Sequence, residues 1–214
     1  MKEMILIGML MFVVMISGCT QPIFQGNAAD IALVEADFDL PVRITEQAEL
    51  TEEYEFYENY ISPKYVIEGL ENAYLTKYGV NTDFTLPDDL KDQKFYDATQ
   101  VILVFPMVNE TINTTSKFIT GTEEEKIQLA VIGGYANYGI KLVDENGTIN
   151  EHKVFPSQGI GDNEFVYWFK GDLNLELYGI TFTKKNVLQK ISIYGQDVNL
   201  EDLRLIAQKA AARI

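Results

Sequence analysis

Short runs of apolar residues in the second half of the chain predict antiparallel strands. Runs rich in β-branched and aromatic residues cover Phe165–Lys170, Leu173–Thr183 and Val187–Tyr194. The last two runs are separated only by Lys184-Lys185-Asn186, and a connection that short joins antiparallel neighbours. We therefore expect a strand meander before the C-terminus.

Further strands are predicted upstream. The continuous apolar run Ala98–Met107 is typical of a buried strand, and Asn137–Phe155 reads as a β-hairpin turning at Asn146-Gly147. Ala32–Phe38 is expected to hold one strand. The Glu- and Tyr-rich segment Glu46–Asn59 fits an edge strand or a loop equally well.

Three segments have helical spacing. Ser62–Tyr78 opens with an N-cap serine and a proline and carries one apolar stripe. Thr122 and Glu125 match a capping box, which predicts a helix that stops at Gly133-Gly134. A final helix is predicted from Asn199 or Leu200 to about Arg213, and a short one from Asn113 or Thr114 through Phe118.

These elements predict an α+β fold. Residues 31–214 are expected to form a single domain, a twisted antiparallel sheet of about five or six strands with packed helices, including a C-terminal helix.

The N-terminus has a different pattern. Lys2 precedes the run Met4–Ile16, which at thirteen residues is shorter than the roughly 20 that a transmembrane helix needs. Ile16-Ser17-Gly18-Cys19 follows and resembles the lipobox of prokaryotic lipoproteins. The resemblance implies a signal peptide at 1–18, a lipid-modified Cys19, and a tether over 19–30. A plain secretory peptide, or a short anchor with an incidental cysteine, is the alternative.

Composition narrows the class of partner. The chain has 47 % hydrophobic residues, which indicates a folded domain, and a net charge of −15, which disfavours nucleic acid and anionic headgroups. Cys19 is the only cysteine, so no disulfide forms within the chain. The lipid on Cys19 is then the expected membrane attachment, facing outside the cytoplasm.

Three N-x-[ST] triplets make Asn109, Asn113 and Asn146 candidate glycosylation sites. They matter only where the cell glycosylates exported proteins.

The sequence holds few groups for chemistry. His152 is the only histidine, and no Cys/His metal set or dinucleotide motif occurs, so we expect no cofactor, no metal and no catalytic residue. Asp162 with Glu164 is a candidate cation pair, although a solvated loop explains it better. Trp168 faces opposite to its neighbours and is a candidate ligand-stacking residue, although core packing explains it better.

The C-terminal 60 residues show a second resemblance. The loop Gly161-Asp162-Asn163-Glu164, the turn Lys184-Lys185-Asn186-Val187 and the helix ending Ala211-Ala212-Arg213 are similar to LpqN-like lipoproteins with the Mog1/PsbP-like fold. Those proteins have a glycine in the turn that this chain lacks. The resemblance implies a fold and an exported setting.

We therefore expect a non-enzymatic binding or sensory lipoprotein that recognises an unidentified protein or small ligand. A structural subunit of an envelope complex is one alternative. An envelope hydrolase that works by carboxylates alone is the other.

Overall fold

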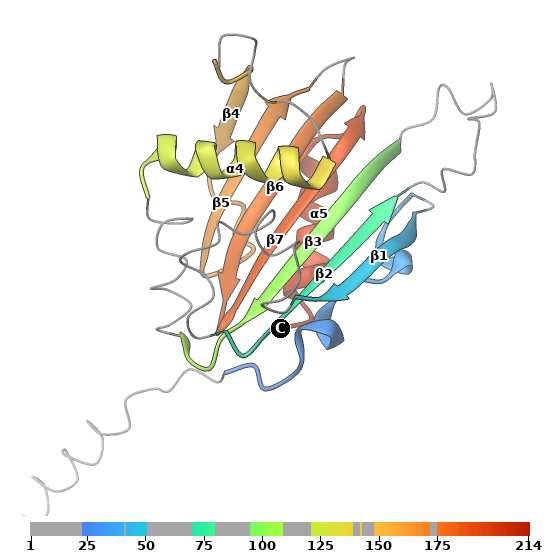
Figure 1. Cartoon of the computed structure of the whole chain (residues 1–214), viewed down its shortest axis with the longest axis vertical. Helices are drawn as coiled ribbons and strands as arrows, with labels where there is room; N and C mark the ends of the chain where they lie inside the picture. Colours follow the sequence, from blue (N-terminus) through green and yellow to red (C-terminus); the bar gives the residue numbers. More distant parts are fainter. Residues whose placement is uncertain are drawn as a thin grey trace, which may run out of the picture.

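The computed structural model describes residues 23–40, 42–50, 70–79, 95–108, 121–138, 142, 148–171 and 175–214. These residues form one antiparallel sheet in the order β1-β2-β3-β7-β6-β5-β4 (Figure 1). The strands are β1 (Arg43–Glu49), β2 (Asn72–Gly79), β3 (Phe95–Val104), β4 (His152–Phe155), β5 (Asn163–Lys170), β6 (Leu175–Lys184) and β7 (Val187–Gln196). The helices are η1 (Ala28–Ile31), η2 (Glu35–Asp37), α4 (Glu123–Tyr138) and α5 (Leu200–Ala211).

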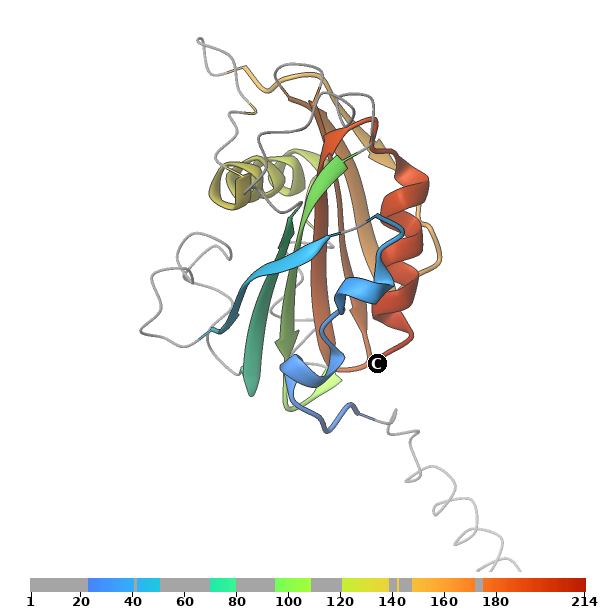
Figure 2. The ribbon, with the colours of Figure 1, turned by 90° about the vertical axis from the view of Figure 1, so that its right-hand side faces the viewer.

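The sheet is covered on both sides. Helix α5 packs on β6 and β7, whereas α4 crosses the opposite side and contacts β5 (Figure 2). We call these two sides the α5 face and the α4 face. The fold is thus α+β and antiparallel as predicted, but its seven strands exceed the predicted five or six.

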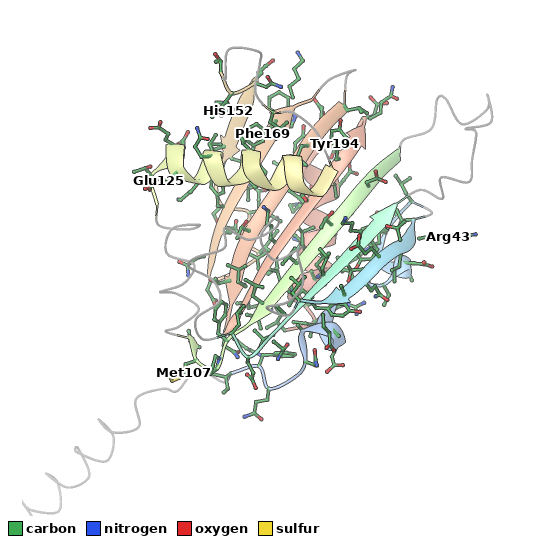
Figure 3. All side chains as sticks on the ribbon, viewed as in Figure 1. Arg43, Met107, Glu125, His152, Phe169 and Tyr194 are labelled. Carbon is green, nitrogen blue, oxygen red and sulfur yellow. The ribbon has the colours of Figure 1, made fainter. Side chains whose placement is uncertain are left out.

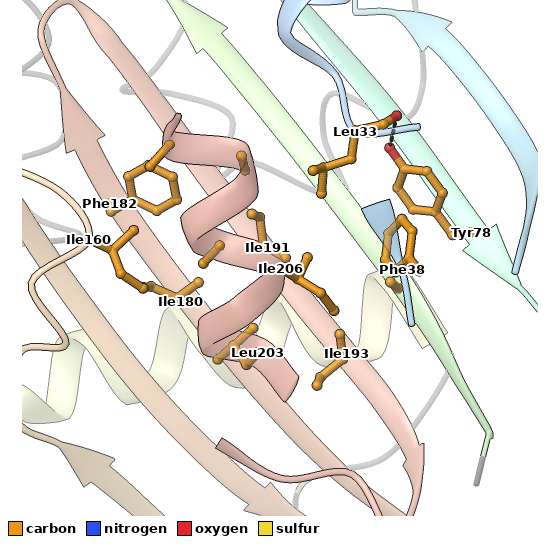
Figure 4. Packing of buried hydrophobic residues seen from close by; sticks show 14 of the residues in the cluster. Leu33, Phe38, Tyr78, Ile160, Ile180, Phe182, Ile191, Ile193, Leu203 and Ile206 are labelled. Carbon is orange, nitrogen blue, oxygen red and sulfur yellow. Dashed lines mark hydrogen bonds between the residues drawn. The ribbon is translucent and has the colours of Figure 1, made fainter. Parts of the chain in front are cut away.

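The largest apolar cluster lies between the sheet and α5 (Figure 4). Ile180, Ile191 and Ile193 from the sheet meet Leu203 and Ile206 from the helix. The predicted final helix is confirmed, including its cap. The Asn199 side chain accepts hydrogen bonds from the backbone N–H groups of 201 and 202 at 2.9 and 3.2 Å.

The N-terminal segment lies against the α5 face. The predicted strand Ala32–Phe38 is wrong, because η2 occupies its second half and its first half belongs to no strand. A buried amide explains the difference: Gln100 Oε1 accepts the Leu33 N–H at 2.8 Å, and Tyr78 Oη donates to the Leu33 carbonyl at 2.7 Å. These side chains satisfy the backbone that a strand would have paired.

The packed part of the chain begins before Ile31. Ala28 is fully buried, and its N–H donates to Asn72 Oδ1 at 2.6 Å. Ala28, which was assigned to the tether from the sequence, thus packs against the sheet.

Strand β2 corrects a second prediction. Residues 72–79 lie in a strand, not in the predicted helix Ser62–Tyr78, of which residues 62–69 lie outside the described part. Both faces of β2 are covered: Leu75 is buried on the α4 face and Tyr78 on the α5 face. A strand with two apolar faces loses the alternation that separates it from a helix.

Helix α4 begins as predicted. Glu125 N–H donates to Thr122 Oγ1 at 3.2 Å, and Thr122 N–H donates to the Glu125 carboxylate at 2.8 Å, which completes the capping box. The helix nevertheless continues through Gly133-Gly134 to Tyr138, so its predicted end is wrong.

Helix α4 also includes residues 137 and 138, which were predicted to begin the hairpin Asn137–Phe155. The Asn150 N–H does donate to the Leu142 carbonyl at 2.9 Å, but β4 pairs with β5. The predicted turn Asn146-Gly147 and the predicted helix through Phe118 lie outside the described residues.

The remaining strands follow the predicted pattern. Strands β3, β5, β6 and β7 lie where the apolar runs predicted them. The segment Glu46–Asn59 was predicted as either an edge strand or a loop, and its first residues, to Glu49, belong to the edge strand β1. The β6–β7 turn is confirmed at Lys185 and Asn186. Lys185 has a φ of 54°, in the left-handed backbone region that favours glycine.

Candidate functional site

Several residues singled out from the sequence lie outside the described part of the chain: Cys19, Asn109, Asn113 and Asn146. His152 lies inside it and is exposed at the start of β4. Its Nδ1 is 2.9 Å from the carbonyl oxygen of Asn150, and its ring centroid is 5.7 Å from that of Phe169. The His152 side chain thus lies at the surface, with one face toward the ring of Phe169.

Trp168 lies on β5 and faces away from Tyr167 and Phe169, as expected from strand alternation. Its ring is half-buried, 6.4 Å from the ring of Tyr178. Its Nε1 is buried, and no hydrogen-bond partner for it occurs among the described residues. Trp168 is six positions along the chain from Asp162, which just precedes β5, and this corresponds to roughly 20 Å of extended chain. The two candidates do not form one site.

Asp162 and Glu164 act on the backbone around them. Asp162 accepts the Lys185 N–H at 3.1 Å. Glu164 accepts backbone N–H groups from Gln158, from Gly159 at 3.0 Å, from Ile160 at 2.8 Å and from Gly161 at 3.3 Å. Its carboxylate holds the loop before β5.

These donors set the acidity of Glu164. Burial alone would raise the pKa of its carboxyl. The backbone donors, together with the Ser157 hydroxyl, outweigh burial and lower the pKa below its ordinary value. The negative charge of the Glu164 carboxylate is therefore stabilised by hydrogen bonds from the loop backbone, and no cation is needed to balance it.

Glu164→Gln is expected to lower the free energy of unfolding by about 1–2 kcal/mol at pH 7, because an amide accepts these hydrogen bonds more weakly. The folded pKa of Glu164 is depressed, so the contribution is present above the unfolded pKa and is lost in acid, as pH falls through the folded pKa. Urea unfolding at pH 7 and in acid measures both effects. Glu151→Gln, at an exposed ion pair with Lys170, is the control. Equal losses in the two variants would contradict this role.

A different polar group occupies the centre of the α4 face. Lys190 lies on β7, the middle strand of the sheet, with Val101 opposite it on β3 and Thr181 on β6. Residues opposite each other in an antiparallel ladder share a face, with Cβ atoms about 4.5–5.5 Å apart. Two residues further along β3 and β7, Thr99 and Ser192 lie opposite each other on the same face.

The hydroxyls around Lys190 are shielded. Thr99 and Ser192 are each 2 % exposed, and Thr181 is 4 % exposed. Thr99 Oγ1 is buried, and none of the described residues offers it a hydrogen bond. An orphan hydroxyl of this kind is costly, so its presence calls for an explanation.

Tyr167 covers the same row from β5. A Cβ placed on Gly179 would lie 2.2 Å from Cζ and 2.3 Å from Oη of Tyr167, so the ring lies over Gly179. Gly179 is opposite Ser192 in the ladder. The glycine thus lets the phenol reach from β5 across β6 toward the Lys190 row.

Apolar clusters flank this row on both sides. Leu188 and Val101 belong to one cluster with Leu103 and Leu75, and Leu177 belongs to another beneath α4. Removal from water lowers the pKa of the Lys190 ammonium to about 8. No carboxylate in the described part of the chain is paired with it. The arrangement provides one partly desolvated positive charge beside hydroxyl groups.

The sequence did not lead us to predict a functional role for Lys190. The signal was the pair Gln189-Lys190 inside an apolar strand, because adjacent polar residues place one polar group on each face. Gln189 lies on the α5 face, where its Oε1 accepts a hydrogen bond from Gln100 Nε2 at 2.8 Å, while its buried Nε2 has no partner among the described residues. Lys190 is its counterpart on the α4 face.

A small cavity of about 120 Å³ lies between η2 and α5. It is lined by Asp37, Asp39, Leu40, Asp202, Leu205, Ile206 and Lys209. Arg213 lies 2.5 Å from Asp37, and Lys209 lies 3.3 Å from Asp39. These ion pairs join residues 37 and 39, in and just after η2, to Lys209 of α5 and to Arg213 just beyond it, so the charged residues at the cavity have a structural role.

The described residues contain no group of three or more His, Cys, Asp or Glu side chains that would hold a metal ion. Their helices include none that is long and apolar enough to cross a bilayer.

No protein-family model and no curated protein matches this chain. Its structure is similar to the extracellular domain of PknH from Mycobacterium tuberculosis, with a TM-score of 0.54 and 10 % sequence identity. The match covers 91 % of this chain and 98 % of that chain. At this identity the likeness concerns the fold.

Proposed function

We propose that this protein is a lipid-anchored, extracytoplasmic and non-enzymatic binding module that takes a small anion on the α4 face of its sheet. The observation that carries the proposal is Lys190, a lysine on the middle strand with its pKa lowered to about 8. The lipobox supports the anchor. The likeness to an extracellular domain supports the location.

The surroundings of Lys190 favour a singly charged ligand with a carboxylate group. One ammonium balances one negative charge, and the hydroxyl of Thr99 supplies a hydrogen-bond donor that is otherwise unused. In a protein of net charge −15, this half-buried cation on the sheet is the exception. A site for an anion explains why a lysine is kept where it is partly removed from water.

The test is a titration with sodium acetate at constant ionic strength, followed by NMR of the backbone amides. We expect saturable shifts at Lys190, Thr181 and Ser192 that weaken as pH rises through about 8, where the ammonium loses its proton. Lys190→Met should abolish the shifts. Lys170→Met, which removes an exposed lysine, should leave them intact. Sodium phosphate as a second probe distinguishes a carboxylate site from a phosphate site.

Equal shifts in wild type and Lys190→Met, or shifts that never saturate, would contradict the anion site.

Cys19→Ser tests the anchor separately. We expect it to abolish labelling by a fatty-acid analogue and to release the protein from the membrane fraction, because the only acylation site is lost. Labelling that persists in this variant would contradict the lipoprotein assignment.

A further inference from the structure

We propose that one end of the domain, formed by Ile23, Phe24, Phe105–Met107 and the β6–β7 turn, lies against the lipid bilayer. We call it the anchor end. This inference rests on the lipid anchor proposed above and adds to it a fixed orientation.

A buried amide ties the N-terminal segment to the anchor end. Asn186, in the β6–β7 turn, is fully buried. Its Oδ1 accepts the Phe24 N–H at 2.6 Å, and its Nδ2 donates to the Phe24 carbonyl at 3.0 Å and to the Phe105 carbonyl at 2.6 Å. The chain therefore enters the fold at this turn.

The distance from the lipid is short. Four residues lead from Cys19 to Ile23, and a fully extended chain spans at most about 14 Å over that length. The headgroup layer of a bilayer is roughly 5–8 Å thick on each side. Because Phe24 is held by Asn186, the anchor end stays beside the lipid interface.

Two of the three large exposed apolar side chains agree with this placement. Among the described residues, the large exposed hydrophobic side chains are Ile23 at 41 %, Met107 at 55 % and Val34 at 45 %. Ile23 is next to Phe24, and Met107 is two residues beyond Phe105, so both neighbour the Asn186 contacts. Such side chains are expected at a lipid interface.

The opposite end of the sheet is then remote from the membrane. Met107 and His152 lie at opposite ends of the strands (Figure 3). Strand β7, which leads away from the turn, has ten residues and a length of roughly 30 Å. The strands rise from the bilayer, which leaves the α4 face with Lys190 accessible from the side.

The experiment uses the lipidated full-length protein in phosphatidylcholine vesicles. Met107→Cys and, as the matched control, His152→Cys each carry an environment-sensitive fluorophore. The label attaches only to the new cysteine, because the Cys19 thiol is blocked by the lipid. Quenching by spin-labelled lipid reports proximity to the bilayer, and cosedimentation with vesicles reports the anchor.

We expect several-fold stronger quenching at position 107 than at position 152. A flexible Gly/Ser insertion of about 15 residues after Thr20 adds a mean span of roughly 20 Å and should abolish the difference. Cosedimentation with equal quenching at both positions would overturn the orientation and leave the anchor standing. Failure to cosediment would overturn both.

Discussion

Replacement of Lys190 by methionine is expected to stabilise the protein at pH 7 by up to about 3 kcal/mol. The folded pKa of about 8 lies below the ordinary lysine value of 10.5, so the folded state holds the ammonium at a cost of about 1.4 kcal/mol per pKa unit. Methionine has a similar length and no charge to desolvate. The gain should appear in urea unfolding at constant ionic strength.

The pH dependence of the free energy of unfolding tests the same prediction in a second way. Between about pH 8 and 10.5 the folded protein has lost the Lys190 proton while the unfolded chain still binds it. The unfolding free energy contributed by this group therefore rises with pH across that window. The advantage of Lys190→Met over wild type should shrink there and be largely gone by pH 10.5.

Lys170→Met is the control, because Lys170 is 57 % exposed in its side chain and forms a surface ion pair. We expect a change of less than about 0.5 kcal/mol, with no special behaviour above pH 8. A Lys190→Met protein less stable than wild type would contradict the view of Lys190 as a desolvated charge. Stabilisation together with loss of acetate binding would show a residue kept for function at the expense of stability.

The part of the fold that sequence predicted well is the part made by local contacts. Strands β5, β6 and β7 and helix α5 follow one another through short connections, and the Asn199 cap and the Lys185-Asn186 turn are readable from neighbouring residues. The capping box at Thr122 succeeded for the same reason.

The failures depend on partners far along the chain. Strand β2 is covered on both faces, so its apolar residues fit a helical stripe as well as a strand. The segment around Leu33 is held by Gln100, 67 positions away, and no local pattern indicates that bond. Lys190 was missed because its significance lies in its cross-strand neighbours Thr181 and Val101.

Asn186→Ala is expected to lower the free energy of unfolding by about 3 kcal/mol. The substitution removes three hydrogen bonds and leaves the buried Phe105 carbonyl without its Nδ2 donor, and an unpaired buried polar group costs about 1–3 kcal/mol. The Phe24 N–H loses its acceptor as well, so hydrogen exchange at this amide should accelerate more than at amides in β7.

Asn163→Ala serves as the control, because this exposed side chain makes a single hydrogen bond of 3.2 Å to Thr183 and should cost well under about 1 kcal/mol.

Asn186→Asp separates hydrogen bonding from packing. Aspartate has nearly the shape of asparagine and keeps the acceptor for the Phe24 N–H. It replaces the donating nitrogen with an oxygen that faces the carbonyls of Phe24 and Phe105. If the amide acts by donating, Asn186→Asp must be at least as destabilising as Asn186→Ala near pH 7, and its defect must lessen in acid, where a protonated carboxyl donates again. A mild effect of aspartate at neutral pH would mean that Asn186 only fills space, and Phe24 would then need another reason to stay at the anchor end.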